Sequence, residues 1–279
     1  MRPETKSFEA GPFLRRAVVF LVRVETHKHL RRLCGHSSRL MSALGIWIKA
    51  RPDDSLVEAN ALRFVAEHTS IPVPKVYCSF VHKGCTYIVM SKIKGTMACN
   101  GWVHRNEQSK QKILGQLREM IAELRAVPPP AGTGVSSVGN GPFFDCRLPS
   151  ELYWGPFATA RNFHEALVEG FNIDRDYTHL PSGLPELFQF CRQPNTQLVL
   201  THGDLSSFNI MVEGDEVTGI IDWETAGWFP PYWEYTCAKN ANPHNLWWAD
   251  EVDAFVEPMP YELKMDRIRL RYFGPFGVY

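Results

Sequence analysis

The sequence lacks several features that would point to common classes of protein. Its seven cysteines are odd in number, lie far apart and include no Cys-x-x-Cys pair, which argues against a disulfide framework and against a zinc site. The longest early apolar run, residues 17–22, is far too short to cross a bilayer, and no secretory cleavage pattern follows it. We therefore expect a cytoplasmic protein with reduced cysteines and no membrane partner.

An excess of charge is also lacking. The 279 residues carry 30 basic and 30 acidic side chains, so no global field would attract nucleic acid. No internal repeat or low-complexity block is present. Because 44% of the residues are hydrophobic, a chain of this length can bury a sizeable core, which predicts one compact unit and not a disordered chain.

What the sequence has is a dense group of oxygen-bearing side chains between residues 198 and 226. Four residues separate Asp204 from Asn209, and His202 precedes them in a His-x-Asp-x-x-x-x-Asn pattern. Phosphoryl transfer requires an acceptor hydroxyl aimed in line at the γ-phosphate, and Mg²⁺ held against the phosphate oxygens. The Asp and Asn of kinase catalytic loops supply both requirements at this spacing. The pattern therefore indicates a phosphotransferase, although an Asp and an Asn in a polar turn are often only turn formers.

A third carboxylate follows the pattern. Two short strands are predicted at residues 210–212 and 217–221, joined by a Glu-Gly-Asp-Glu turn. Such a hairpin would return the chain so that Asp222 lies beside Asn209. A third oxygen donor at that place makes an accidental pattern much less plausible.

This stretch resembles the aminoglycoside phosphotransferase and choline kinase group, which are protein-kinase-like enzymes that phosphorylate small molecules. His-Gly-Asp-Leu-x-x-x-Asn and the following Ile-Asp-Trp-Glu carry the resemblance, and residues 201–235 most resemble the fungal branch. The resemblance implies that Asp204 is the catalytic base. It also implies that Asn209 and Asp222 bind Mg²⁺.

Two residues near the N-terminus match the same family. Lys49 ends a predicted strand over residues 46–48, and Glu58 lies in the first turn of a helix predicted over residues 55–68. A lysine at a strand end is usually solvated, but the helix that follows favours a functional role. The resemblance implies that Lys49 contacts the α- and β-phosphates of ATP and that Glu58 pairs with it.

The remaining nucleotide contacts are expected from a loop and a hinge. Residues 35–39 lack the repeated glycines of protein kinases; Ser37, Ser38 and nearby amides could bind phosphate, or form an ordinary turn. Strands predicted at residues 76–81 and 86–90 lead into an extended hinge. Main-chain groups at such a hinge commonly bind adenine. The candidate adenine contacts are Met90, Ser91 and Ile93.

The resemblance and the element pattern together predict an α+β, protein-kinase-like fold with two lobes. Residues 1–93 would form an antiparallel-sheet lobe with a helix, and residues 94–279 a mainly helical lobe. Apolar spacing predicts a helix over residues 109–125 with Ser109 as its N-terminal cap. The Gly- and Ser-rich segment that follows is a long loop, which a compact domain usually keeps only for a purpose. Further helices are predicted at residues 14–33, 157–170 and 185–191.

We predict an enzyme that uses ATP (or GTP) and Mg²⁺ to phosphorylate a hydroxyl of a small molecule, such as an aminoglycoside, choline or another amine alcohol. The segment after Asp222 interleaves rings with carboxylates, which would suit a cationic substrate. Ordinary aromatic packing beside a solvated acidic face explains the same pattern. The residues concerned are Trp223, Glu224, Trp228, Trp233, Glu234, Tyr235, Trp247, Trp248, Asp250, Glu251 and Asp253.

Two other functions remain open at this point. A nucleotide-binding pseudokinase that serves as a scaffold would explain the degenerate phosphate loop, although the retained Asp204, Asn209 and Asp222 speak against it. Protein kinase activity is disfavoured, because no Asp-Phe-Gly is followed by an activation loop and Ala-Pro-Glu. The pattern leaves the oligomeric state undetermined.

Overall fold

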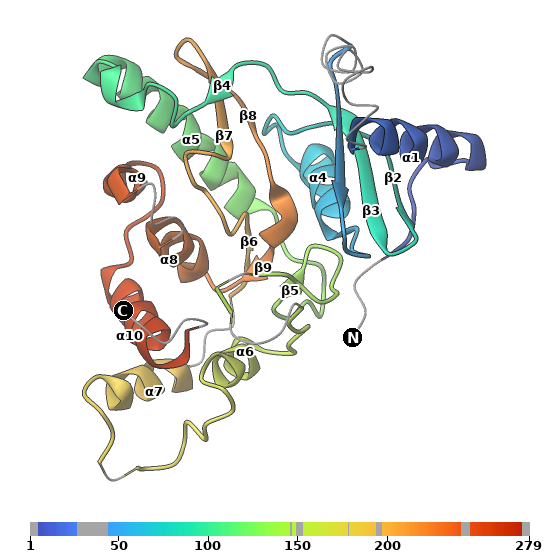
Figure 1. Ribbon diagram of the computed structural model, residues 1–279. Coiled ribbons are helices and arrows are strands. Elements are labelled where there is room, and N and C mark those ends of the chain that lie inside the picture. Colours follow the sequence, from blue (N-terminus) through green and yellow to red (C-terminus); the bar gives the residue numbers. More distant parts are fainter. Residues whose placement is uncertain are drawn as a thin grey trace.

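An antiparallel sheet forms the centre of the N-terminal lobe (Figure 1). Its strands β1 (Ile46–Arg51), β2 (Val76–His82) and β3 (Cys85–Ser91) lie in the order β1-β3-β2. The hairpin β2–β3 confirms the pairing expected from the sequence, whereas β1 runs two residues beyond the Lys49 at which it was expected to end. The computed structural model describes residues 5–26, 44–145, 147–148, 153–177, 179–193, 197–240 and 246–274.

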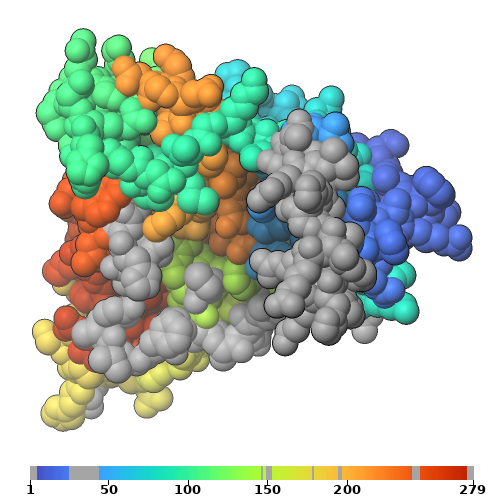
Figure 2. Space-filling view, turned by 45° about the horizontal axis from the view of Figure 1, so that its top comes forward, coloured from blue at the N-terminus to red at the C-terminus, as the bar shows by residue number. Residues whose placement is uncertain are grey.

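Helices α1 (Pro12–Thr26) and α4 (Val57–His68) cover opposite faces of this sheet. Alternate residues of a strand point to opposite sides, and β3 follows this rule. Its Tyr87 and Val89 pack with α1, while Ile88 and Met90 belong to the cluster that includes α4. The α1 helix projects from one side of the molecule (Figure 2). The expected helix over residues 14–33 is therefore present as far as residue 26, beyond which the chain lies outside the described residues.

The second lobe contains most of the helices. The longest described helix, α5 (Glu107–Ala126), begins after Asn106, whose side chain accepts a hydrogen bond of 2.8 Å from the amide of Ser109. The prediction that Ser109 itself is the cap was wrong. The other helical elements are η1 (Trp102–His104), α6 (Ala160–Leu167), α7 (Leu184–Arg192), η2 (Trp223–Thr225), α8 (Tyr232–Asn240), α9 (Leu246–Glu251), η3 (Val252–Ala254) and α10 (Pro260–Phe273).

Short strands connect these helices in two small antiparallel sheets, β4-β7-β8 and β5-β9-β6. The predicted hairpin after Asn209 is present as β7 and β8. Among the described helices, none has the length and apolarity needed to cross a bilayer. The strands are β4 (Thr96–Met97), β5 (Ser136–Ser137), β6 (Val199–Thr201), β7 (Ile210–Glu213), β8 (Glu216–Ile220) and β9 (Gly227–Phe229).

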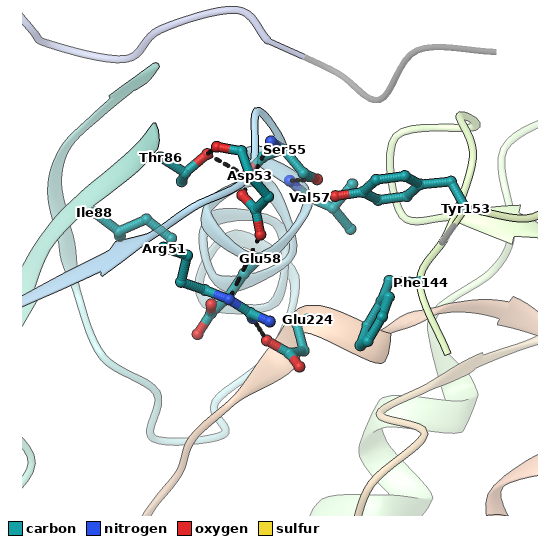
Figure 3. Close-up of a pocket in the computed structure, with 10 residues that line it drawn as sticks. All are labelled: Arg51, Asp53, Ser55, Val57, Glu58, Thr86, Ile88, Phe144, Tyr153 and Glu224. Carbon is teal, nitrogen blue, oxygen red and sulfur yellow. Dashed lines mark hydrogen bonds and ion pairs between the residues drawn. The ribbon is translucent and has the colours of Figure 1, made fainter. Parts of the chain in front are cut away.

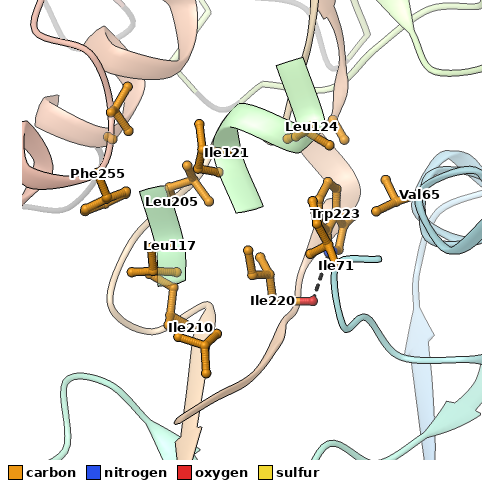
Figure 4. Close-up of a cluster of buried hydrophobic side chains, with 14 of the residues drawn as sticks. Val65, Ile71, Leu117, Ile121, Leu124, Leu205, Ile210, Ile220, Trp223 and Phe255 are labelled. Carbon is orange, nitrogen blue, oxygen red and sulfur yellow. Dashed lines mark hydrogen bonds between the residues drawn. The ribbon is translucent and has the colours of Figure 1, made fainter. Parts of the chain in front are cut away.

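One hydrophobic cluster spans the two lobes (Figure 4). Val65 of α4 belongs to it together with Leu117 of α5 and Trp223 of η2, and all three are fully buried. The indole nitrogen of Trp223 donates to the carbonyl oxygen of Ile220 at 2.9 Å. Because α4 packs on η2, the cluster fixes Glu58, in the first turn of α4, relative to the residue that precedes η2, Asp222.

A buried histidine lies in the helical lobe. His164 of α6 is 1% exposed; its Nδ1 lies 3.3 Å from the carbonyl oxygen of Cys191, and its Nε2 lies 2.8 Å from the hydroxyl of Tyr232. A carbonyl oxygen only accepts, so Nδ1 carries the proton and the Tyr232 hydroxyl donates to Nε2. Burial lowers the pKa of His164 to about 4, against a smaller opposing effect of the Cys191 carbonyl.

This histidine should make stability fall in mild acid. Between its ordinary pKa and the depressed folded value, the unfolded chain binds the proton that the folded chain excludes, so stability is lost as the pH falls below about 6.5. We expect a loss of about 2 kcal/mol between pH 8 and pH 5 from this residue. Urea unfolding at both pH values, for wild type and His164→Gln, measures it; equal losses in both proteins would contradict the assignment.

Candidate active site

The predicted catalytic pair meets in the loop between β6 and β7. The Nδ2 group of Asn209 donates to the backbone oxygen of Asp204 at 2.9 Å and to its Oδ2 at 2.8 Å. Asn209 is buried, whereas Asp204 is only partly so. Because Nδ2 is the donor in both contacts, the oxygen of the Asn209 carboxamide is the atom that can accept a cation.

His202 connects this loop to the residues that follow β8, which lead to Asp222. Its Nδ1 accepts from the amide of Asp204 at 3.1 Å, so its Nε2 is the protonated nitrogen and donates to the carbonyl oxygen of Ile221 at 3.0 Å. The amide of Ile221, the residue after β8, donates to the backbone oxygen of Asn209 at 2.9 Å. These bonds bring Asp222 next to the loop of residues 202–209, as the hairpin predicts.

Glu234 of α8 stabilises the same loop by accepting hydrogen bonds from its backbone amides, a role that the sequence did not reveal. Its carboxylate accepts from the amide of His202 at 2.6 Å and from that of Gly203 at 3.0 Å, and the residue is 1% exposed. Thr225 adds a bond of 2.8 Å from its hydroxyl to the His202 carbonyl. The sequence left two alternatives for the group that includes Glu234, a site for a cationic substrate or a solvated acidic face, and the buried, amide-bonded carboxylate of Glu234 fits neither. Its position between bulky apolar residues on helix α8 was the available signal of burial.

Two residues of the site adopt left-handed backbone conformations. Gly203 has φ of +83°, and an added Cβ would lie 2.9 Å from the carbonyl oxygen of Thr225, so only glycine fits there. Asp222, at φ 63° and ψ 60°, adopts this conformation with a side chain. A left-handed backbone conformation costs a non-glycine residue conformational free energy, and such residues are found more often at functional sites.

Lys49 lies where the two lobes meet. Its Nζ is 2.7 Å from Oε2 of Glu58 and 2.6 Å from Oδ1 of Asp222. The expected pairing of Lys49 with Glu58 is therefore present in the structure. Glu58 is 6% exposed; burial raises its pKa, although the ammonium of Lys49 opposes the shift.

Arg51 and Glu224 extend this charge network and were missed as members of it. Arg51 lies two residues after Lys49 on β1 and forms an ion pair with Glu224, which is also 3.6 Å from the Lys49 Nζ. Carboxylate oxygens of Glu58, Asp222 and Glu224 all lie within 4.8 Å of one another, an arrangement that attracts a cation. In this structure the ammonium of Lys49 contacts all three.

A small cavity of about 40 Å³ lies beside Arg51 (Figure 3). Phe144 and Tyr153, from the long loop between β5 and α6, form one wall of it. The hydroxyl of Tyr153 points towards Ser55 at the start of α4, and burial raises the pKa of this phenol. The long loop therefore reaches the helix that carries Glu58.

The predicted hinge lies at the end of β3. The amide of Ser91 donates to the carbonyl oxygen of Lys75 at 2.9 Å, and the amide of Lys92 to that of Gly45 at 2.8 Å. Met90 is buried, and the side chain of Ile93 lies against the Cα of Gly219. Of the predicted phosphate-loop residues, Ser37 and Ser38 lie outside the described part of the chain.

The aromatic residues after Asp222 are mostly packing residues. Four tryptophans of that segment are at most 2% exposed. Tyr235 donates to Asp253 at 2.9 Å, and Glu251 accepts from the indole of Trp102 at 2.9 Å, so these carboxylates already have partners. The packing alternative is the better one for the buried members, which are Trp223, Trp228, Trp233 and Trp248.

Sequence comparison assigns this arrangement of residues to a family. The family model described as "Phosphotransferase enzyme family" matches residues 49–259. The chain belongs to this phosphotransferase family, and the expected enzyme class, a small-molecule kinase, is confirmed. An aminoglycoside 3'-phosphotransferase of Niallia circulans is 26% identical over 218 residues, which cover 78% of this chain and 74% of that protein. An aminoglycoside 3'-phosphotransferase of Enterococcus faecalis is 22% identical over 205 residues, which cover 73% of this chain and 71% of that protein.

Solved structures confirm the α+β, kinase-like fold. The aminoglycoside phosphotransferase APH(4)-Ia, in a ternary complex with ADP and hygromycin B, aligns with a TM-score of 0.57 at 17% identity, over 81% of this chain and 79% of that one. An aminoglycoside-3'-phosphotransferase of type VIII aligns with a TM-score of 0.52 at 20% identity, over 82% and 85%.

Proposed function

We propose that this protein transfers the γ-phosphate of ATP to a hydroxyl of a small molecule, with Asp204 as the base that orients and deprotonates the acceptor. The observation that carries the proposal is the convergence of the 202–209 loop, with its Asp204–Asn209 pair, and the Lys49–Glu58–Asp222 group. Phosphoryl transfer depends mainly on positioning and charge neutralisation, and these are the groups that the reaction requires.

The residues present fit Mg²⁺. Asp222 offers a carboxylate and Asn209 the oxygen of a carboxamide, and Mg²⁺ prefers such oxygen ligands beside phosphate oxygens and water. The ion would supply neutralisation of phosphate charge when bound. The ammonium of Lys49, which now contacts Asp222, would then be available to the phosphates, while Glu58 continues to pair with it.

The adenine would bind at the hinge through Met90, Ser91 and Ile93. Since the amide of Ser91 already donates to the Lys75 carbonyl and Met90 is buried within strand β3, we infer that the amide of Ile93 is the best-placed donor of the three. Ser37 and Ser38 remain our proposed phosphate contacts. The lobe boundary at residues 93 and 94 would place the hinge between the two lobes.

For the acceptor we propose a cationic amine alcohol of the aminoglycoside or choline type. The proteins that this chain matches support the aminoglycoside type, because aminoglycoside 3'-phosphotransferases are among them. We also propose that residues 201–235 place the chain in the fungal branch of the family, and we therefore keep choline and other amine alcohols as candidate acceptors. The acceptor hydroxyl would lie against Asp204.

Thermal stabilisation by ATP with and without Mg²⁺ tests the nucleotide site. A ligand near 100 times its Kd stabilises the native state by about 2.7 kcal/mol, which raises Tm by roughly 5 °C in a chain of this size. We expect this shift in wild type with Mg²⁺, its loss in Asp222→Ala, and its retention in the exposed-carboxylate control Asp176→Ala. Absence of any shift in wild type would contradict the proposal.

Phosphoryl transfer is then measured as acceptor-dependent ADP release with hygromycin B, streptomycin, kanamycin and choline. Release with an amine alcohol supports the proposed acceptor class. Binding of Mg²⁺ and ATP with no transfer to any of them, and no ATP hydrolysis, would favour the nucleotide-binding pseudokinase.

A further inference from the structure

We propose that Arg147 is a positioning residue for the catalytic loop, acting on Asp204 through the carbonyl group of Gly203. This inference rests on the proposed function. The Nη2 group of Arg147 donates to the Gly203 carbonyl oxygen at 2.6 Å, one peptide bond before Asp204. Arg147 belongs to the long segment between α5 and β6, which has no other assigned role in catalysis.

The guanidinium of Arg147 has a fixed orientation. Its Nε donates to Oδ1 of Asp145 at 2.8 Å and its Nη2 to Oδ2 at 2.6 Å, a two-pronged contact that defines the plane of the group. The backbone amide of Arg147 also donates to Asp145 Oδ1 at 2.9 Å. Asp145 is 3% exposed, so this pair is sheltered from solvent.

An electrostatic interaction between Arg147 and Asp204, the proposed base, supports the role of Arg147 in positioning this loop. Burial acts to lower the pKa of Arg147, but the neighbouring carboxylates of Asp145 and, to a smaller extent, Asp204, together with Cys237, raise it well above its usual range. The cation therefore lies within the field of the carboxylate that would accept the proton from the acceptor hydroxyl.

The Gly203 residue is bound at both ends. Its amide donates to Glu234 at 3.0 Å, and its carbonyl accepts from Arg147 at 2.6 Å. With φ of +83°, glycine at this position has few steric limits of its own, so these contacts determine how the chain enters Asp204. Without Arg147 the peptide between Gly203 and Asp204 would keep only the bond of 3.1 Å from its amide to Nδ1 of His202, so its carbonyl end would tilt and the Asp204 carboxylate would shift relative to the acceptor hydroxyl.

A misplacement of about 1 Å in a catalytic group can cost about 100-fold in rate. We therefore expect Arg147→Ala to lower kcat by roughly 100-fold while KM for ATP changes less than about threefold. Arg147→Lys should have a kcat close to that of Arg147→Ala, because an ammonium cannot make the two-pronged contact with Asp145 and also reach the Gly203 carbonyl. Added guanidinium ion should raise the kcat of Arg147→Ala by about tenfold, because the ion fills the site that the side chain has left. The control Arg161→Ala removes a partly exposed arginine of α6 and should match wild type.

Hydrogen exchange of the peptide covering residues 199–209 provides a readout that does not depend on turnover. Faster exchange in Arg147→Ala than in Arg161→Ala, at equal Tm shifts with Mg²⁺ and ATP, supports the proposal. An unchanged kcat, unchanged exchange, or a loss of rate that guanidinium ion does not restore would overturn it. If wild type neither transfers phosphate nor hydrolyses ATP, the proposed function fails, while the exchange experiment still tests the contact.

Discussion

Replacing Asp204 with asparagine should lower kcat by about 10²- to 10⁴-fold, the range typical for loss of a positioned general base. The substitution keeps the size of the side chain but removes the negative charge. Its carboxamide oxygen can still accept from Nδ2 of Asn209, which now donates to the Asp204 carboxylate at 2.8 Å, so the substitution tests the charge and basicity of the group. The effect should be confined to turnover, because Lys49 and Glu58 pair with each other and not with Asp204.

Initial rates of ADP release with a saturating acceptor measure this effect, and Asp176→Asn is the matched control because its carboxylate is exposed. The thermal shift with Mg²⁺ and ATP should remain close to that of wild type in Asp204→Asn. If the variant retains more than about a tenth of wild-type kcat, Asp204 is not the base and another group must orient the acceptor.

The parts of the site that could be predicted are those encoded by local spacing. Asp204 and Asn209 lie on one loop, and the β7–β8 hairpin that returns the chain to Asp222 is short. Lys49 lies 173 residues from Asp222, so no local pattern could bring them together. Their proximity was expected only because the chain resembles a kinase family.

Two of the residues that were missed, Glu234 and Arg147, bind backbone groups. Glu234 accepts from two amides of the 202–209 loop, and Arg147 donates to one carbonyl of this loop. Every residue except proline has the same backbone donor and acceptor. A sequence therefore does not show which side chain will reach which peptide group, since that depends on how α8 and the long loop pack.

Tertiary contacts also explain why the cap of α5 was misassigned. Asn106 and Ser109 are both residues that favour the N-terminal cap. In the structure the hydroxyl of Ser109 donates to Asp215 on the β7–β8 turn at 2.6 Å, and Asn106 accepts from the Ser109 amide. A partner more than 100 residues away thus gives Ser109 a role inside the helix.

The carboxylate of Glu234 leads to the largest expected effect on stability. Both of its oxygens accept from buried amides, at 2.6 Å from His202 and 3.0 Å from Gly203. Glutamine has nearly the same shape but only one accepting oxygen, so in Glu234→Gln an NH₂ group would face one of the two N–H donors. Hydrogen bonds to a charged group contribute about 1.5–3 kcal/mol, and a buried donor without a partner costs about 1–3 kcal/mol.

We therefore expect Glu234→Gln to lower the free energy of unfolding by about 3 kcal/mol and Tm by roughly 5 °C. Glu257→Gln, which changes an exposed carboxylate, should leave both values within error. Scanning calorimetry measures the shift, and kcat measured well below the lowered Tm separates loss of fold from loss of geometry. Because the two amides belong to the residues immediately before Asp204, we expect kcat to fall in the folded variant too. A Tm equal to that of wild type would show that solvent or another acceptor replaces the carboxylate, and that the loop does not depend on Glu234.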